Sequence, residues 1–269
     1  MFLYILITLS GIYLLLLIGL FCMQRRLVFY PTRDIFATPH NFGIPFEDVY
    51  FETSDGVKIN AWFVPADNAE FTVLFCHGNG GCLAHRVETV ELYNKLGVNF
   101  FIFDYRGYGL SEGVASEHGI YLDAESAWRF LVEEKGIPPE KIVLIGRSLG
   151  GAPASKLAAE KHPRRLICES SFISIPETGS DSYPYLPVRQ LARYKFPTGD
   201  YLKQVKCPAL IIHSRKDEVV RFRHGQKLFE LASPPKIFLE LTGTHDECYF
   251  DCRDKYTAAV SRFIFGPAE

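Results

Sequence analysis

The sequence predicts an α/β protein in which a mostly parallel, eight-stranded sheet is flanked by helices, with a small lid and an N-terminal transmembrane helix. Three observations support this fold class. The chain has 269 residues, of which 48% are hydrophobic and 22% charged, a composition typical of a globular protein with its own core. Short apolar runs rich in β-branched and aromatic residues alternate with helix-like stretches. The first apolar stretch is long enough to cross a bilayer.

Residues 1–24 are predicted to form the transmembrane anchor, and residues 25–269 the globular domain. Residues 2–23 carry no charged side chain, and at about 1.5 Å of rise per residue a helix of this length crosses a hydrocarbon core of about 30 Å. A cleavable signal peptide usually has a basic start and a small-residue cleavage site, and this segment has neither. A cleaved signal and a buried core helix remain as alternatives.

The orientation of the anchor is predicted from the basic residues that follow it. Arg25, Arg26 and Arg33 all lie on the C-terminal side of the apolar stretch, and none precedes it. By the positive-inside rule, we expect a single-pass membrane protein whose globular domain is cytoplasmic.

Eight apolar runs are expected to form the strands, in the order 48–53, 57–65, 71–76, 98–103, 141–145, 166–168, 209–212 and 237–241. Helices are predicted at 85–96, 119–134, 151–162, 224–231 and 249–265. The first two strands have no helix between them, whereas repeated strand and helix units follow. This order indicates a mixed sheet that is mainly parallel, with helices on both faces. The irregular segment 171–206 is rich in Pro and Tyr, and we expect it to form the lid.

The charge balance and the cysteines exclude other classes of function. The chain has 29 basic and 31 acidic side chains and no basic run longer than two residues, which argues against a nucleic-acid partner. The seven cysteines are irregularly spaced, so reduced thiols are expected. His245, Cys248 and Cys252 have a spacing that could present three zinc ligands on one helical face. Because a fourth ligand is missing nearby, we predict no metal site.

The motif Gly146-Arg147-Ser148-Leu149-Gly150 is the first feature that indicates chemistry. A predicted strand leads into it and a predicted helix follows. Its two glycines allow a sharp turn from strand to helix, which would project the Ser148 hydroxyl above the sheet at a helix N-terminus. In this context the sequence resembles the α/β-hydrolase family. The resemblance implies the α/β-hydrolase fold, with Ser148 as the nucleophile.

A serine is a weak nucleophile unless a base removes its proton. The family's chain order is Ser, then Asp or Glu, then His. His245 follows the last predicted strand, where the family keeps its general base. By contrast, His213 closes a strand and His224 falls on a helix. The resemblance therefore implies that His245 is the base.

The acid is expected after the preceding strand. Asp217 matches the family's position there. Glu218, one residue later, and Glu169, at the end of an earlier strand, remain alternatives, because such a triad is defined by geometry rather than by position.

The resemblance also implies two backbone N–H groups that bind the oxyanion of the reaction. Leu149, the residue after the nucleophile, supplies the first. The strand 71–76 is followed by His77-Gly78-Asn79-Gly80-Gly81, and Asn79 matches the family's second donor. An ordinary glycine turn is the alternative interpretation. His77 is expected to brace this loop, and residues 104–111 to act as scaffold, with Asp104 and Arg106 in polar contacts.

Together the motifs are similar to those of the membrane-anchored Bem46-like hydrolases, whose relatives include abhydrolase-domain proteins that act as depalmitoylating thioesterases. Five sequences carry the likeness: Arg25-Arg26 after the anchor, His77-Gly78-Asn79-Gly80, Asp104-Tyr105-Arg106-Gly107-Tyr108-Gly109, Gly146-Arg147-Ser148-Leu149-Gly150-Gly151 and Gly243-Thr244-His245-Asp246. The chain departs from many members at Ser214 and at Asp246-Glu247, and neither departure removes a triad group.

The resemblance implies a serine hydrolase of the carboxylesterase or thioesterase type, which works through an acyl-enzyme without a cofactor. Its expected partners are a small-molecule or lipid-derived acyl ester and the lipid bilayer. Tyr183, Tyr185, Leu186 and Phe196 of the expected lid either line an acyl pocket or pack the lid onto the core. A serine peptidase of the same fold and a catalytically silent membrane-bound adaptor are the alternative functions.

Overall fold

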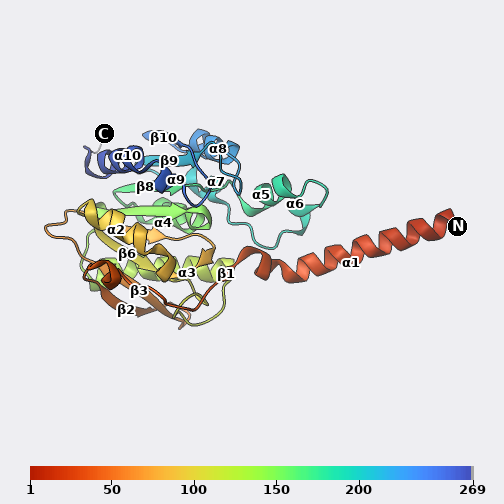
Figure 1. Cartoon of the computed structure of the whole chain (residues 1–269), viewed down its shortest axis with the longest axis horizontal. Coiled ribbons are helices and arrows are strands. Elements are labelled where there is room, and N and C mark those ends of the chain that lie inside the picture. Colours follow the sequence, from red (N-terminus) through yellow and green to blue (C-terminus); the bar gives the residue numbers. More distant parts are fainter. Residues whose placement is uncertain (268–269) are drawn as a thin grey trace.

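The structure, a computed structural model, describes residues 1–267 and has the predicted α/β architecture (Figure 1). Its eight-stranded sheet has the order β10-β9-β8-β7-β4-β6-β3-β2. Strand β3 is antiparallel to its neighbours β2 and β6, and every other neighbouring pair is parallel. The strands are β2 (Glu47–Glu52), β3 (Lys58–Val64), β4 (Thr72–Cys76), β6 (Asn99–Phe103), β7 (Ile142–Arg147), β8 (Arg165–Glu169), β9 (Ala209–Ser214) and β10 (Lys236–Leu241).

The burial of the strands follows from their place in the sheet. Every residue of β4, β7, β8 and β9 is buried, as expected for central strands covered by helices on both faces. Edge strand β2 is mostly exposed, and only Phe51 of its six residues is buried. Together with the strand directions given above, this burial confirms the predicted sheet, which is mainly parallel and covered by helices on both faces.

Helices cover both faces of the sheet. On one face, buried side chains of α3 (Glu117–Arg129), α4 (Gly151–Lys161) and α8 (Arg223–Leu231) belong to one core cluster. On the other face, α2 (Val87–Lys95), α9 (Cys248–Asp251) and α10 (Arg253–Phe265) supply a second cluster. The helix predicted at 249–265 is thus two helices that meet at Cys252. The helix predicted at 119–134 is α3 followed by a π-helical turn (Phe130–Glu134).

Short 3₁₀ turns complete the regular structure at Pro39–Phe42, Leu83–Arg86, Pro139–Lys141 and Ser148–Gly150. The last of these turns joins β7 to α4, and it contains the candidate nucleophile.

The predicted anchor is one continuous apolar helix, α1 (Phe2–Val28), which extends away from the globular part (Figure 1). None of its residues is buried, so its apolar side chains have no protein core to cover them. The helix continues four residues beyond the predicted boundary at residue 24. Phe29, directly after it, is buried in the domain core. Helix α1 is therefore joined to the domain without a flexible linker.

The segment predicted as the lid, 171–206, contains three helices of two kinds. Helices α5 (Ile175–Ser182) and α6 (Val188–Leu191) project from the domain (Figure 1). Helix α7 (Thr198–Leu202) instead packs in the core, with Thr198, Gly199 and Leu202 buried. Of the aromatic candidates for an acyl pocket, Phe196 is fully buried, whereas Tyr183 and Tyr185 are exposed.

A second, two-stranded sheet was not expected from the sequence. In it, β1 (Tyr30–Pro31) pairs in parallel with β5 (Gly80–Gly81). Strands of two residues show no hydrophobic alternation, so no sequence pattern indicates them.

Candidate active site

Ser148 lies at the sharp turn between β7 and α4. Its backbone has φ 52°, in the left-handed region that non-glycine residues rarely occupy. The flanking glycines make the turn possible. A Cβ at Gly146 would overlap the Gly150 carbonyl oxygen, and a Cβ at Gly150 would overlap the carbonyl oxygen of Cys76. The strain at Ser148 is typical of a side chain that the fold must aim in one direction.

His245 lies between Ser148 and Asp217. Its Nε2 is 3.1 Å from Ser148 Oγ, and its Nδ1 is 2.7 Å from Asp217 Oδ2. All three residues are more than nine-tenths buried. Because a carboxylate only accepts hydrogen bonds, Nδ1 carries the hydrogen that is donated to Asp217. In the neutral imidazole, Nε2 then carries no hydrogen and can accept the Ser148 hydroxyl proton.

Asp217 is held in place by its other carboxylate oxygen. Oδ1 accepts the backbone N–H groups of Val219 at 3.0 Å and Val220 at 2.7 Å. His213, at the end of β9, donates from Nε2 to the Val220 carbonyl at 2.8 Å and thereby braces the same loop. Sequence reasoning assigned His213 no role beyond closing its strand, because only the folded loop brings it near the acid.

The two alternative acids have other partners. Glu218 accepts the backbone N–H of His245 at 3.1 Å, so its carboxylate holds the histidine's main chain rather than its ring. Glu169 is fully buried and binds Arg147 Nε at 2.9 Å together with the hydroxyls of Tyr93 and Tyr256. Of the three carboxylates, only that of Asp217 contacts the His245 ring.

The loop His77–Gly81 lies against the nucleophile turn. A Cβ at Gly78 would be 3.6 Å from Ser148 Cβ, an ordinary van der Waals distance. The backbone N–H of Asn79 donates to no protein group among residues 1–267. Leu149 is in the first turn of the helical segment that starts at Ser148, where N–H groups have no partner within the helix. Both predicted oxyanion donors are therefore next to Ser148 in the fold or in the chain.

Buried polar groups brace this loop from below. His77 donates from Nδ1 to the Gly78 carbonyl at 2.6 Å, and Tyr105 donates its hydroxyl to the His77 carbonyl at 2.9 Å. Burial lowers the pKa of His77 to about 3, so its ring is neutral. Burial also raises the pKa of Asp104 to about 8, although its carboxylate accepts the Leu83 N–H at 3.0 Å.

The expected scaffold after β6 is also built from polar contacts. Arg106 binds Asp123 through Nε at 2.9 Å and Asp55 through its two terminal nitrogens at 2.8 and 3.0 Å. These bonds fix the segment after β6, from which the Tyr105 hydroxyl donates to the His77 carbonyl.

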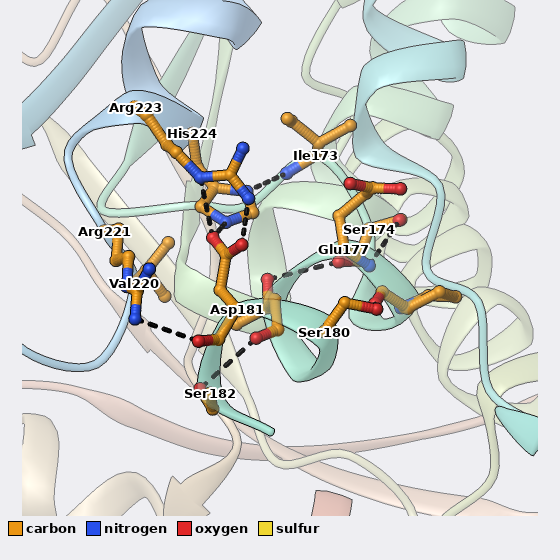
Figure 2. A network of polar contacts seen from close by, with 12 residues as sticks. Ile173, Ser174, Glu177, Ser180, Asp181, Ser182, Val220, Arg221, Arg223 and His224 are labelled. Carbon is orange, nitrogen blue, oxygen red and sulfur yellow. Dashed lines mark hydrogen bonds and ion pairs between the residues drawn. The ribbon is translucent and has the colours of Figure 1, made fainter. Parts of the chain in front are cut away.

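Helix α5 is held by hydrogen bonds and ion pairs to residues 221–224, which follow the loop of Asp217 (Figure 2). Asp181 accepts hydrogen bonds from His224 Nε2 at 2.9 Å and Arg223 Nε at 2.8 Å, and its main-chain carbonyl accepts from Arg221 at 2.9 Å. The Ile173 N–H donates to His224 Nδ1 at 3.3 Å. Burial lowers the pKa of His224, which favours this neutral tautomer. No spacing in the sequence indicates these contacts.

Cys168 and Cys248 are buried thiols rather than competing nucleophiles. Burial raises the pKa of Cys168 and of Cys248 to about 12, so both thiols are protonated at neutral pH. Both ring nitrogens of His245 are already engaged by Ser148 and Asp217. Within the described part of the chain, no three His, Cys, Asp or Glu side chains are grouped as metal ligands.

The geometry therefore combines a hydroxyl, an imidazole that can accept its proton, and a carboxylate that orients the imidazole. The loop that carries Asn79 packs against the same turn. Such a constellation can transfer an acyl group through a covalent intermediate.

The sequence matches the model of a family described as "Serine aminopeptidase, S33" over residues 67–198. This range contains Asn79, Ser148 and Leu149. Asp217 and His245 lie beyond its end.

Relatives resemble the chain over most of their length. The α/β hydrolase domain-containing protein WAV2 of Arabidopsis thaliana is 30% identical over 285 residues, which cover 96% of this chain and 91% of that protein. An uncharacterized membrane protein of Saccharomyces cerevisiae is 34% identical over 258 residues, covering 91% of this chain and 90% of that protein. An uncharacterized protein of Mycobacterium tuberculosis is 33% identical over 222 residues, covering 82% and 79%.

Solved structures share the fold. An esterase of Pyrococcus furiosus superposes with a TM-score of 0.74 at 23% identity, covering 87% of this chain and 98% of that one. An α/β hydrolase of Vibrio vulnificus superposes with a TM-score of 0.69 at 22% identity, covering 80% of each chain.

Proposed function

Because this chain belongs to the Bem46-like family of α/β hydrolases, we propose that it is a membrane-anchored serine hydrolase that cleaves an acyl ester or thioester. Ser148 is the nucleophile, His245 the general base and Asp217 the acid that orients it. The observation that carries this proposal is the pair of contacts made by the His245 ring, 3.1 Å to Ser148 Oγ and 2.7 Å to Asp217. These distances match those of a nucleophile, base and orienting acid.

The first half of the reaction acylates the enzyme. Ser148 Oγ attacks the substrate's carbonyl carbon while its proton moves to His245 Nε2. The imidazolium that forms is stabilised by Asp217. When the tetrahedral intermediate collapses, the bond from carbon to the leaving oxygen or sulfur breaks, and His245 returns the proton to the departing alcohol or thiol.

The second half releases the acyl group. A water molecule gives a proton to His245 Nε2 and attacks the acyl-enzyme carbonyl, and the bond to Ser148 Oγ then breaks. The serine recovers its proton, and a carboxylic acid leaves. In both halves the carbonyl oxygen becomes an oxyanion, which the N–H groups of Asn79 and Leu149 stabilise.

The membrane association of the chain accompanies this chemistry. Helix α1 is apolar and unburied, and the yeast relative is described as a membrane protein. We propose that α1 spans the bilayer once and that the hydrolase domain is cytoplasmic. A cavity of about 580 Å³ at the C-terminal end of α1 supports this orientation, because it is lined by Arg25, Arg26 and Arg193. Anionic lipid headgroups of the cytoplasmic leaflet would lie at this end of the helix and would attract these three cations.

Labelling with a fluorophosphonate, followed by kinetics on nitrophenyl butyrate and an acyl thioester, tests the proposed chemistry. We expect the probe to attach to Ser148, and Ser148→Ala to abolish labelling and lower kcat at least about a thousandfold. Ser155→Ala is the matched control, since Ser155 is buried on α4 and, among residues 1–267, its hydroxyl has a hydrogen-bond contact only with Cys168 Sγ. Labelling that persists in Ser148→Ala, or a wild-type protein that the probe does not label, would contradict the proposal. The latter result would favour a silent adaptor.

A serine aminopeptidase is the second candidate, favoured by the description of the family model that matches residues 67–198. The same groups would cleave an amide, with His245 protonating the leaving amine. Aminoacyl nitroanilides assayed beside the esters separate the two candidates. We expect the ester to be the better substrate by kcat/KM, and the reverse order would favour the peptidase.

A further inference from the structure

The chain that leaves the anchor runs directly along the loop that carries Asn79. We call Val28–Thr32 the exit segment, from the last residue of α1 to the residue after β1. Tyr30 donates its N–H to the Asn79 carbonyl at 3.0 Å, and Thr32 donates its N–H to the Gly81 carbonyl at 3.2 Å. These bonds form the parallel pair of β1 and β5.

The side chain of Asn79 makes a third connection. Its Nδ2 donates to the Val28 carbonyl at 3.0 Å. Val28 is the final residue of α1, and carbonyls at a helix C-terminus lack partners within the helix. On the domain side, the Tyr108 hydroxyl donates to the Asn79 carbonyl at 2.8 Å. The carbonyl and side chain of Asn79 are thus engaged, while its N–H points to no protein acceptor among the described residues.

The end of the anchor is itself fixed to the domain. Phe29 is buried and meets the rings of Tyr194 and Phe196 edge to face, with centroids 5.0 and 6.1 Å away. Gln24, in the last two turns of α1, donates to the Leu191 carbonyl at 2.8 Å and accepts the Arg193 N–H at 2.7 Å. The exit segment therefore has a defined position from which to hold the loop.

A loop of this composition needs external support. Gly78, Gly80 and Gly81 allow the chain to adopt many conformations, so the bonds within the loop alone leave Asn79 poorly restrained. An oxyanion donor acts only if it is held within roughly 0.5 Å of its productive position. The exit segment supplies two of the hydrogen bonds that restrain Asn79 directly, one to its carbonyl and one from its side chain.

We propose that the exit segment positions the Asn79 N–H for the oxyanion, so that the membrane anchor is an integral part of the catalytic machinery as well as a tether. The Tyr30 N–H and the Asn79 side chain are the positioning groups. This inference rests on the proposed serine hydrolase function. A tilt or rotation of α1 in the bilayer would change the position of the loop His77–Gly81, because the Val28 carbonyl and β1 connect the helix to that loop.

Two substitutions at Tyr30 in the full chain, reconstituted in nanodiscs, isolate the backbone bond. Tyr30→Pro removes the N–H that Asn79 accepts, and Tyr30→Ala removes the same exposed side chain but keeps the N–H. Phe29 has φ −112° and ψ 124°, a conformation that a following proline favours. We expect Tyr30→Pro to have a kcat for nitrophenyl butyrate at least about tenfold below that of Tyr30→Ala, with KM changed less than about twofold.

Asn79→Ala provides the second perturbation, since it removes the bond to Val28 and keeps the backbone N–H of residue 79. We expect kcat to fall about tenfold. The double variant with Tyr30→Pro should lose less than the product of the two single effects, because both act on one loop. A role in stability alone would lower Tm and leave kcat unchanged at a temperature well below Tm.

Hydrogen exchange of residues 77–82 separates failure of this inference from failure of the proposed function, because it does not depend on activity. We expect amide exchange in this loop to be about three- to tenfold faster in Tyr30→Pro than in Tyr30→Ala. Equal exchange and equal kcat in the two folded variants would overturn the inference. If the wild-type protein hydrolysed no ester, unchanged exchange would still overturn it, and faster exchange would support the coupling of anchor and loop.

Discussion

Replacing Asp217 by Asn should inactivate the protein through the wrong histidine tautomer, and the structure defines how. Asp217 Oδ1 accepts the N–H groups of Val219 and Val220. An asparagine must keep its oxygen at that position, because its NH₂ group would otherwise face two donors. The amide NH₂ is then directed at His245 Nδ1, which is 2.7 Å from the present Oδ2.

Facing that donor, the His245 ring must accept at Nδ1 and carry its hydrogen on Nε2. Nε2 then donates to Ser148 Oγ and cannot take its proton. In a serine protease the equivalent change lowers kcat about 10⁴-fold, which corresponds to about 5.5 kcal/mol of transition-state stabilisation. We expect a loss of this size for Asp217→Asn, with little change in Tm, because the side-chain shape and the Oδ1 bonds are retained.

Kinetics on nitrophenyl butyrate, with Glu218→Gln as the matched control, test this prediction. Glu218 accepts the His245 backbone N–H, and a glutamine oxygen can do the same, so its kcat should remain within about threefold of wild type. The reasoning is refuted if Asp217→Asn keeps more than a tenth of the wild-type kcat, or if Glu218→Gln loses more than Asp217→Asn.

Three further predictions concern the elements that support the site. Gly150→Ala should yield little folded protein and no fluorophosphonate labelling, because the new Cβ overlaps the Cys76 carbonyl. Gly78→Ala is the control, and it should fold and be labelled because its new Cβ would have its nearest contact at 3.6 Å. Soluble, labelled Gly150→Ala would contradict this prediction. Glu169→Gln should lower the free energy of unfolding by about 3 kcal/mol in chemical denaturation, since it leaves the buried Arg147 charge uncompensated, and a loss below about 1 kcal/mol would show that the pair contributes little. Burial lowers the pKa of His77 to about 3 in the folded protein, so as the pH falls below about 6.5 the unfolded chain takes up a proton at this residue and the folded chain does not. The contribution of His77 to the free energy of unfolding is therefore complete above about pH 6.5 and is lost as the pH falls toward 3. Tm measured from pH 7.5 to 4.5 should therefore fall more steeply in wild type than in His77→Gln, and equal slopes would argue against this contribution.

The sheet and the turn that carries Ser148 could be predicted from the sequence because both depend on local signals. Central strands are buried on both faces and appear as short apolar runs, and all eight were expected within a few residues of their observed bounds. The turn at Ser148 needs glycines at positions 146 and 150, and these can be recognised directly in the sequence. The helix break at Cys252 left no such signal.

The residue pattern alone left the choice among neighbouring acids open, and the family resemblance favoured Asp217. Asp217 and Glu218 are adjacent, and both carry carboxylates. In the fold, the Asp217 carboxylate meets the His245 ring and that of Glu218 meets the His245 main chain. Side-chain direction in a loop depends on the bonds made by Val219 and Val220, which no pattern of residue types specifies.

The sequence by itself determined the apolar N-terminal helix, the order of strands and helices, and which residues stand at the ends of strands, because these follow from local hydrophobic periodicity and turn chemistry. Only the tertiary structure decided that the exit segment pairs with the loop of Asn79, about 50 residues away, and that Asp181 fastens helix α5 to His224. Both are contacts between segments distant in the chain. They depend on where the whole sheet places those segments, so no short stretch of sequence contains them.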